Sequence, residues 1–260
     1  MARIVTANWR AALMLAFVLS AVSGNEEASA ADTSVYELRI YTCEPGKLGA
    51  LHERFRNHTM RIFEKHGIVN VAYWVPTDVP KSANTLVYLL RHKSRDAAKA
   101  SWKAFLDDPD WKAVAKASQE KDGKILAQPP VSVYLTPTDY SPDVKPARKD
   151  KLYELRVYTA AEGKLDALHA RFRDHTDKLF AKHGMMAYAY WKPTDEPQAG
   201  TAMYYVLETP SRDRAKESWK AFAGDPEWDA ARKASEANGS LLAQRPESTY
   251  LTPTDYSPEK

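Results

Sequence analysis

His58 and His175 are the residues of this chain best placed for acid–base chemistry, because they recur 117 positions apart in matching sequence contexts. A histidine beside an arginine and a tyrosine could act as a general acid or base on a bound molecule. On a helical wheel His58 falls at the border of an apolar stripe, about 80° from Leu48. A histidine at such a border is either a pocket residue, possible catalysis included, or a hydrogen-bonded boundary residue. Both interpretations stay open.

Alternating polar residues supply the other groups that such a site needs. Glu37, Arg39 and Tyr41 alternate with Leu38 and Ile40. If the two apolar residues pack under helices, the charged set faces an opposed sheet, where buried charges must be paired. The set is then either an inter-sheet salt-bridge network or the polar lining of a small-molecule cavity. The predicted ligand-binding residues are Glu37, Arg39, Tyr41, Tyr73, Trp74, Glu154, Arg156, Tyr158, Tyr190 and Trp191.

The remaining reactive side chains predict no metal site. His52 and His66 are separated by about 21 Å along a helix axis, so they cannot share a metal ion. Cys43 is the only cysteine, and Ala160 takes its place in the second context, so a shared catalytic thiol is not expected. The sequence contains no nucleophile elbow, phosphate loop, dinucleotide fingerprint or Cys/His metal spacing. These residues predict no cofactor.

An internal repeat organises the chain. Residues 36–42, YELRIYT, return as YELRVYT at 153–159, and the offset of 117 holds without a gap to Ser118, with 47 identities over 83 positions. After one deletion near Gly123 the match resumes, and YLTPTDYSP at 134–142 returns at 250–258. Two copies are too few for a solenoid, which favours a pseudo-twofold pair.

Each repeat reads as β-α-β-β-α-β. Residues 36–42 alternate in polarity as a strand does, and apolar residues from 47 to 66 recur at helical spacing over about five turns. Further strands are predicted at 69–75, 85–91 and 131–135. A second helical region is capped by Ser94 and continues from Asp108-Pro109. This order is ferredoxin-like, so the fold class is α+β, and two such sheets packed face to face would form a barrel within one chain.

The repeats resemble the NIPSNAP family of the dimeric α/β-barrel superfamily. The resemblance rests on five segments of the first repeat, residues 36–42, 45–48, His58, 65–67 and 108–111, and on their counterparts 153–159, 163–165, His175, 182–184 and 225–228. It implies the barrel fold but little chemistry, because the family has no agreed enzymatic activity. The superfamily includes cofactor-independent and haem-degrading monooxygenases. The resemblance therefore implies an enzyme alternative, a cofactor-light monooxygenase or a haem-handling enzyme that uses His58 or His175 beside Arg39 and Tyr41, and haem is the one cofactor that it suggests.

The first 30 residues resemble a secretory signal peptide. Arg3 and Arg10 precede an apolar run at 11–22, and Ala28-Ser29-Ala30 is a small-residue cleavage site. The run is shorter than the roughly 20 residues that span a bilayer, so stable membrane insertion is not expected. Cleavage near Ala30 would leave a secreted or periplasmic protein.

Four segments are therefore predicted: a signal peptide at 1–30, a first domain at 31–142, a linker at 143–150 and a second domain at 151–260. The net charge of +3 is spread over interleaved acidic and basic residues, which excludes a nucleic-acid-binding face. The expected function is binding of a small molecule or a protein partner through the barrel interior. The chain is expected to be a pseudo-dimer that can assemble further into a homo-oligomer.

Overall fold

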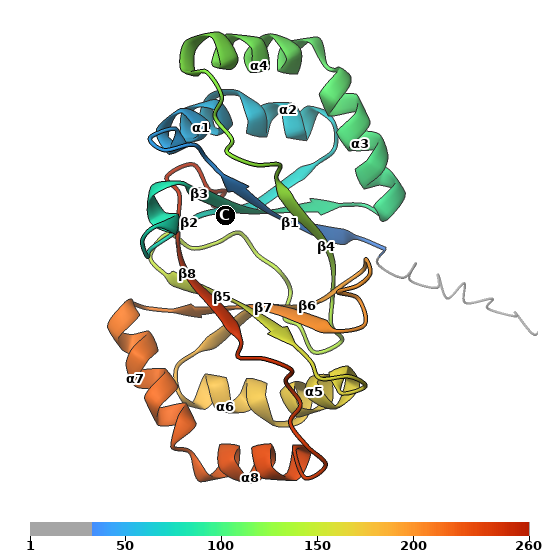
Figure 1. The fold of residues 1–260 in the computed structure, drawn as a ribbon, viewed down its shortest axis with the longest axis vertical. Coiled ribbons are helices and arrows are strands. Elements are labelled where there is room, and N and C mark those ends of the chain that lie inside the picture. Colours follow the sequence, from blue (N-terminus) through green and yellow to red (C-terminus); the bar gives the residue numbers. More distant parts are fainter. Residues whose placement is uncertain (1–32, 260) are drawn as a thin grey trace, which may run out of the picture. The chain divides into compact units, whose positions relative to one another are not determined.

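The computed structural model describes residues 33–259, so the predicted signal peptide lies outside the described residues. Figure 1 shows two layers of helices on the outside of a central set of strands. The first repeat comprises β1 Val35–Thr42, α1 Leu48–Arg54, η1 Phe55–Thr59, α2 Met60–Lys65, β2 Val69–Pro76, η2 Lys81–Ala83, β3 Thr85–His92, α3 Arg95–Asp107, α4 Pro109–Asp122 and β4 Val131–Pro137. The second comprises β5 Leu152–Thr159, α5 Leu165–Arg171, η3 Phe172–Thr176, α6 Asp177–Lys182, β6 Met186–Pro193, β7 Ala202–Thr209, α7 Arg212–Ala223, α8 Pro226–Ser235 and β8 Glu247–Pro253.

Local sequence explains where the helices begin and end. The Ser94 hydroxyl accepts a hydrogen bond from the Ala97 amide at 3.1 Å and caps α3, as predicted. Asp108 caps α4 in the same way, at 2.7 Å from the Asp110 amide, with Pro109 at the first position. Gly67 follows α2 with a φ of 73°, a left-handed conformation that glycine adopts without strain.

All eight strands form one closed antiparallel barrel in the order β1-β3-β2-β8-β5-β7-β6-β4. Each repeat contributes four neighbouring strands, and β2 pairs with β8 while β4 pairs with β6 to join the two halves. The predicted ferredoxin-like halves and the barrel within one chain are therefore confirmed. Closure also removes the free strand edges that each half would otherwise present.

Three apolar cores hold this arrangement together. One core, the barrel core, lies between the two sheets and mixes residues of both repeats, including Leu38, Trp74, Leu155 and Trp191. The other two lie between each sheet and its own helices. The expectation that Leu38 and Ile40 pack under the helices is wrong, because Leu38 belongs to the barrel core and Ile40 packs against it. The opposite face of β1 therefore meets the helices.

The segment 143–150 packs against the barrel rather than hanging free between domains. Ala147 is 1% exposed and Val144 packs against the barrel core. The Arg148 amide donates a hydrogen bond to the Tyr153 hydroxyl at 2.6 Å, and the Tyr188 hydroxyl donates to the Lys145 carbonyl oxygen. The linker is thus part of the folded unit.

Candidate functional site

The predicted polar residues form a buried network beneath the helices. The Glu37 carboxylate, which is fully buried, accepts hydrogen bonds from Arg39 Nη1 at 2.5 Å and Trp102 Nε1 at 2.7 Å. Ser132 Oγ donates at 2.6 Å and His92 Nε2 lies 3.0 Å away. Since Trp102 is on α3, the network joins the sheet to a helix. The prediction that Glu37, Arg39 and Tyr41 face the opposed sheet is wrong.

The second repeat builds the same network around Glu154. Its partners are Arg156 Nη1, Trp219 Nε1 and Ser248 Oγ, each at 2.6 Å. Thr209 stands where His92 stands in the first repeat. Salt bridges do exist in these residues, but each joins two residues of one strand, Glu37 to Arg39 and Glu154 to Arg156, and does not connect the two sheets.

Hydrogen bonding sets the charge state of the first network. Burial alone raises the pKa of Glu37, but the hydrogen bond with His92 and the charge of Arg39 outweigh it and lower that pKa to about 2 from 4.5. The Arg39 guanidinium lies 4.4 Å from the centre of the Trp102 ring, where the ring face attracts a cation. These partners occupy both oxygens of the Glu37 carboxylate, while Arg39 Nε is buried without a hydrogen bond. We therefore interpret the network as structural.

The tyrosines and tryptophans of the predicted set divide between the cores. Tyr41 and Tyr73 lie in the core under the first repeat's helices, and Tyr158 and Tyr190 lie in the equivalent core of the second. These four residues therefore do not line the barrel interior, contrary to the prediction. Only Trp74 and Trp191 of the set point into the barrel core.

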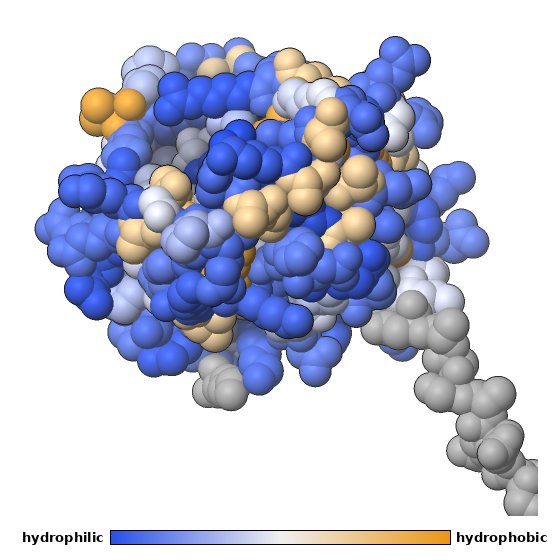
Figure 2. Space-filling view, turned by 90° about the horizontal axis from the view of Figure 1, so that it is seen from below, coloured by the Kyte–Doolittle hydropathy of each residue, from blue (hydrophilic) through white to orange (hydrophobic). Residues whose placement is uncertain are grey.

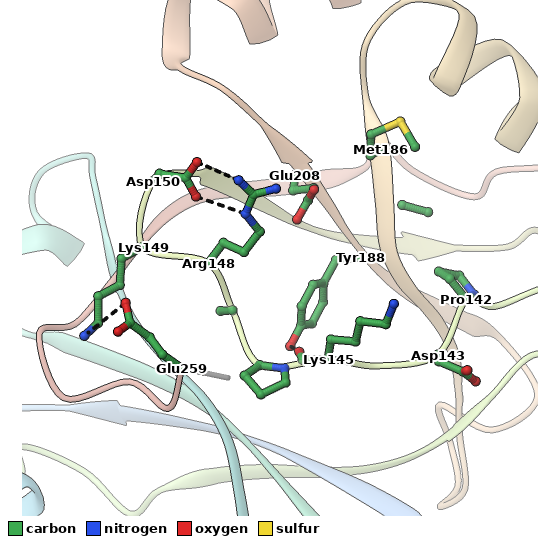
Figure 3. A pocket seen from close by; sticks show the side chains of 13 residues that line it. Pro142, Asp143, Lys145, Arg148, Lys149, Asp150, Met186, Tyr188, Glu208 and Glu259 are labelled. Atoms are coloured by element: carbon green, nitrogen blue, oxygen red, sulfur yellow. Dashed lines mark hydrogen bonds and ion pairs between the residues drawn. The ribbon is translucent and has the colours of Figure 1, made fainter.

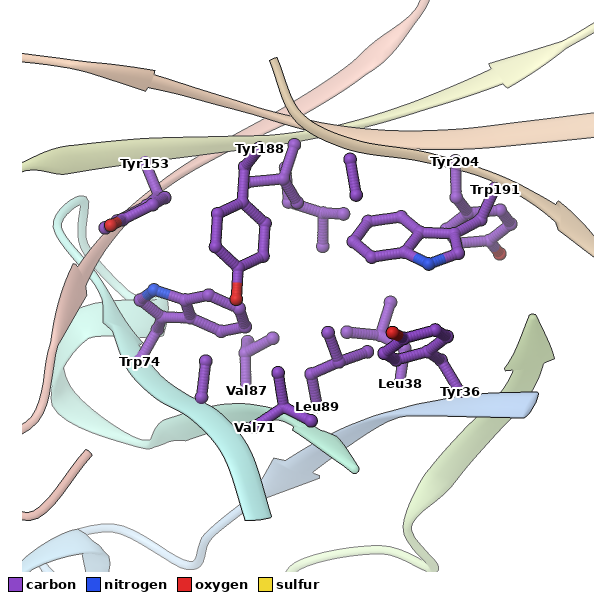
Figure 4. Close-up of a cluster of buried hydrophobic side chains, with 14 of the residues drawn as sticks. Tyr36, Leu38, Val71, Trp74, Val87, Leu89, Tyr153, Tyr188, Trp191 and Tyr204 are labelled. Carbon is purple, nitrogen blue, oxygen red and sulfur yellow. The ribbon is translucent and has the colours of Figure 1, made fainter. Parts of the chain in front are cut away.

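Aromatic and aliphatic side chains fill the barrel interior (Figure 4). The space left between Leu38, Trp74, Trp191 and their neighbours is about 10 Å³, which is about the volume needed to hold one water molecule. The ring of Tyr188 meets Trp74 edge-on, with centres 5.9 Å apart. Among residues 33–259, the predicted small-molecule cavity is therefore not found between these central side chains, and a hollow of about 240 Å³ lies instead where Pro80 and Lys81 adjoin Val87 and Leu155.

The two candidate histidines lie on the outer helices and not in the barrel interior. His58 is in η1 and His175 is in η3, and both are exposed. Among residues 33–259 no hydrogen bond joins either histidine to Arg39 or Arg156, and the hollow that His58 lines includes neither Arg39 nor Tyr41, the residues beside which the enzyme alternative placed it. His58 instead lines a hollow of about 350 Å³ between α1, η1 and α4.

A larger hollow, which we call the linker hollow, lies between the linker and the second sheet (Figure 3). Its volume is about 910 Å³. The Tyr188 side chain, Ala147 and Met186 provide apolar surface, and a β-bulge between Ala187 and Ala189 shifts the strand register beside Tyr188. Sequence reasoning missed this hollow because the charged, proline-containing linker gave no sign of packing against the sheet.

Charged groups surround the linker hollow, and three of them, Asp143, Lys145 and Glu208, are unpaired among the described residues. Arg148 pairs with Asp150 at 2.8 Å and Lys149 pairs with Glu259 at 3.3 Å. The side chains of Lys145 and Glu208 also line the hollow, but they form no ion pair or hydrogen bond with any residue that the structure describes. The hollow therefore offers one free cation and two free carboxylates beside an apolar surface.

The outer surface is largely polar where the second repeat's helices cover it. Figure 2 shows that face as mostly hydrophilic, with a narrow band of weakly hydrophobic residues. No helix among residues 33–259 is long and apolar enough to cross a membrane. In the same residues, no three His, Cys, Asp or Glu side chains are grouped so that they could hold a metal ion.

Comparison with known proteins gives a family and a fold. Residues 36–142 and 153–258 each match the NIPSNAP family. No protein of curated function matches the sequence. An uncharacterized NIPSNAP-like domain protein from Burkholderia xenovorans is 18% identical, with 45% of this chain and 96% of that chain covered and a TM-score of 0.38.

Two other solved structures cover both repeats. A protein provisionally named a monooxygenase, from Fusobacterium nucleatum subsp. nucleatum ATCC 25586, is 10% identical over 86% of this chain and 94% of that chain, with a TM-score of 0.54. An anthrone oxidase-like protein is 15% identical over 86% of this chain and 92% of that chain, with a TM-score of 0.53. At these identities the similarity shows the shared fold alone.

Proposed function

The chain belongs to the NIPSNAP family, with one family domain in each repeat, and from this premise we propose that it is an exported protein that binds a small molecule in the linker hollow. The barrel serves as a rigid scaffold in this proposal. The linker, which both family domains lack, completes the site.

The observation that carries the proposal is the composition of the linker hollow. Its volume of about 910 Å³ lies within the range of pockets that take small molecules. Apolar surface from Tyr188 and Met186 would contact the body of a ligand, while Lys145 and Glu208 would fix polar groups at its ends. A ligand with a compact apolar body and with both a negatively and a positively charged substituent fits these groups.

An oxygenase reaction inside the barrel is less well supported. The structural relatives named as a monooxygenase and as anthrone oxidase-like share the fold. In this chain, however, the space between Leu38, Trp74 and Trp191 at the centre of the barrel is about 10 Å³. A hollow of about 240 Å³ beside Val87 and Leu155 has no histidine among its lining residues. The exposed positions of His58 and His175 also leave the barrel without a histidine from the predicted pair.

A ligand screen by thermal unfolding tests the proposal, because a compound that binds only the folded state raises the unfolding temperature. Met186→Trp should fill part of the linker hollow and abolish the shift given by a true ligand. Val69→Trp is the matched control, since Val69 is the equivalent residue of the first repeat and is also exposed, 42% against 52% for Met186. Binding that survives Met186→Trp would contradict the assignment of the site.

Export rests on the sequence of the first 30 residues. The mature protein recovered from the host is expected to begin at Ala31 and to appear outside the cytoplasm. Intact-mass measurement of the fractionated protein checks both points. A full-length cytoplasmic chain would contradict export without affecting the ligand site.

A further inference from the structure

Two equivalent arginines, Arg54 and Arg171, have different surroundings in the two repeats. In the second repeat Arg171 is 5% exposed, and its Nη1 donates hydrogen bonds to Glu236 Oε1 at 2.9 Å and Ser235 Oγ at 3.4 Å. The Glu236 carboxylate also lies 3.7 Å from Arg232. A carboxylate held by arginine thus fills the space where the C-terminal end of α8 meets α5.

The first repeat keeps the arginine but lacks the carboxylate. Gln119 takes the place of Glu236, and Ala115 takes the place of Arg232. The Arg54 side chain forms no hydrogen bond or ion pair with any residue from 33 to 259. Its guanidinium lies 5.5 Å from the centre of the Trp111 ring, and its Nε is buried.

A second polar group beside Arg54 is also without a partner. Ser118 is the counterpart of Ser235, and its buried Oγ makes no hydrogen bond with the described residues. The Arg54 guanidinium is half-buried, and its Nε lacks a partner as Arg171 Nε does, but unlike Arg171 it has no acceptor at Nη1. A partly buried guanidinium and a buried hydroxyl both lose free energy when nothing replaces the water removed from them. Two such groups side by side indicate a place for an acceptor from outside the chain.

Free space adjoins both groups. Hollows of about 350 Å³ and 240 Å³ share Arg54 and Ser118 as lining residues. The larger one has an apolar wall of Ala50, Ala113, Val114 and Ala117. We call this space the Arg54 hollow.

We propose that the Arg54 hollow binds a small monocarboxylate, whose carboxylate takes the position that Glu236 occupies in the second repeat. The compact apolar part of the ligand, an aromatic ring or a short chain, would lie against Val114 and the alanines. Arginine suits this role because its planar guanidinium matches a carboxylate.

The charges around the hollow favour a monoanion over a phosphate. Glu53 and Asp122 also line the larger hollow. Glu53 is paired with Lys121 at 3.2 Å across the opening, and Asp122 makes no ion pair with Arg54. Their negative charges would repel a dianion more strongly than a single carboxylate.

Benzoate and hexanoate are suitable probes, with benzamide as the neutral control and inorganic phosphate as the alternative anion. Titration calorimetry is expected to detect the two carboxylates. In NMR spectra, benzoate should shift the ring signals of His58, which lines the hollow, and leave those of His175 unchanged. Equal binding of benzamide, tighter binding of phosphate, or absence of carboxylate binding would overturn the proposal.

Two variants test the internal comparison. Gln119→Glu places a carboxylate where the second repeat has one, at an exposed helix position that does not endanger folding, and should weaken benzoate binding at least about tenfold. Arg54→Gln should weaken it similarly, whereas Met186→Trp in the linker hollow should have no effect. Unchanged affinity in Gln119→Glu would overturn the proposal. Loss of benzoate binding in Met186→Trp alone would assign the carboxylate to the linker hollow instead.

Discussion

Glu37 and Glu154 each connect a strand to a covering helix through one buried carboxylate. Each carboxylate collects an arginine, a tryptophan indole and a serine hydroxyl from three separate elements. A buried charge is tolerated only when its hydrogen-bonding capacity is used in this way. The same saturation leaves neither carboxylate free to bind a ligand.

Replacing Glu37 with glutamine should make the free energy of unfolding depend less on pH in the acidic range. Because the pKa of Glu37 is about 2 in the folded protein against 4.5 ordinarily, its charge stabilises the fold by roughly 3 kcal/mol above pH 4.5. That contribution falls as the pH drops from 4.5 and is lost near pH 2. Urea unfolding of wild type and Glu37→Gln at several pH values measures the difference.

The exposed Glu162 provides the control for this comparison, since Glu162→Gln should leave the pH dependence unchanged. At pH 7, Glu37→Gln should also leave Arg39 buried without its charge partner and destabilise the protein. A stability difference between wild type and Glu37→Gln that stays constant from pH 7 to pH 2.5 would contradict the assigned role.

At the level of elements, alternation along β1 predicted the strand but not the orientation of its faces. A period of two shows that Glu37, Arg39 and Tyr41 share one side and that Leu38 and Ile40 share the other. Both sides of this strand are buried, one by helices and one by the opposite sheet. The polarity pattern therefore does not indicate which side of β1 faces the barrel. The residues predicted to line the pocket lie on the side that faces the helices.

The helix after β1 shows a second limit of periodicity. The spacing of apolar residues predicts one regular helix, but η1 and η3 interrupt it with a π turn in each repeat. The Met60 amide donates to the Phe55 carbonyl, five residues back, and the Thr59 hydroxyl donates to the Arg54 carbonyl at 3.2 Å. A single added residue per turn changes the apolar spacing too little to be seen in the sequence, although it changes the direction of His58.

Comparison of the repeats, rather than periodicity, is what exposes the Arg54 hollow. The exchange of Glu236 for Gln119 is visible in the sequence, and it would have been read as a surface difference because neither residue lies in an apolar stripe. Its meaning depends on Arg171 being buried next to Glu236, which only the fold shows.

The whole molecule depends on one half covering the other. The two seams between the halves are equivalent in register: Trp74 pairs with Pro253, and Trp191 pairs with Pro137, each residue being the repeat counterpart of the other. Each half alone would expose two strand edges and the apolar inner face that now forms the barrel core.

Because the seams are equivalent, residues 31–142 expressed alone should close the barrel with a second copy. Strand β2 of each copy would pair with β4 of the other, and the aromatic residue Trp74 would again be covered. Sedimentation analysis is expected to show a homodimer, and Leu89→Arg on the inner face should prevent it, because an unpaired charge would enter the barrel core. A stably folded monomer of this half would contradict the prediction and would show that the core between sheet and helices suffices for folding. The barrel would then be an assembly of two independently folding domains and not a single cooperative unit.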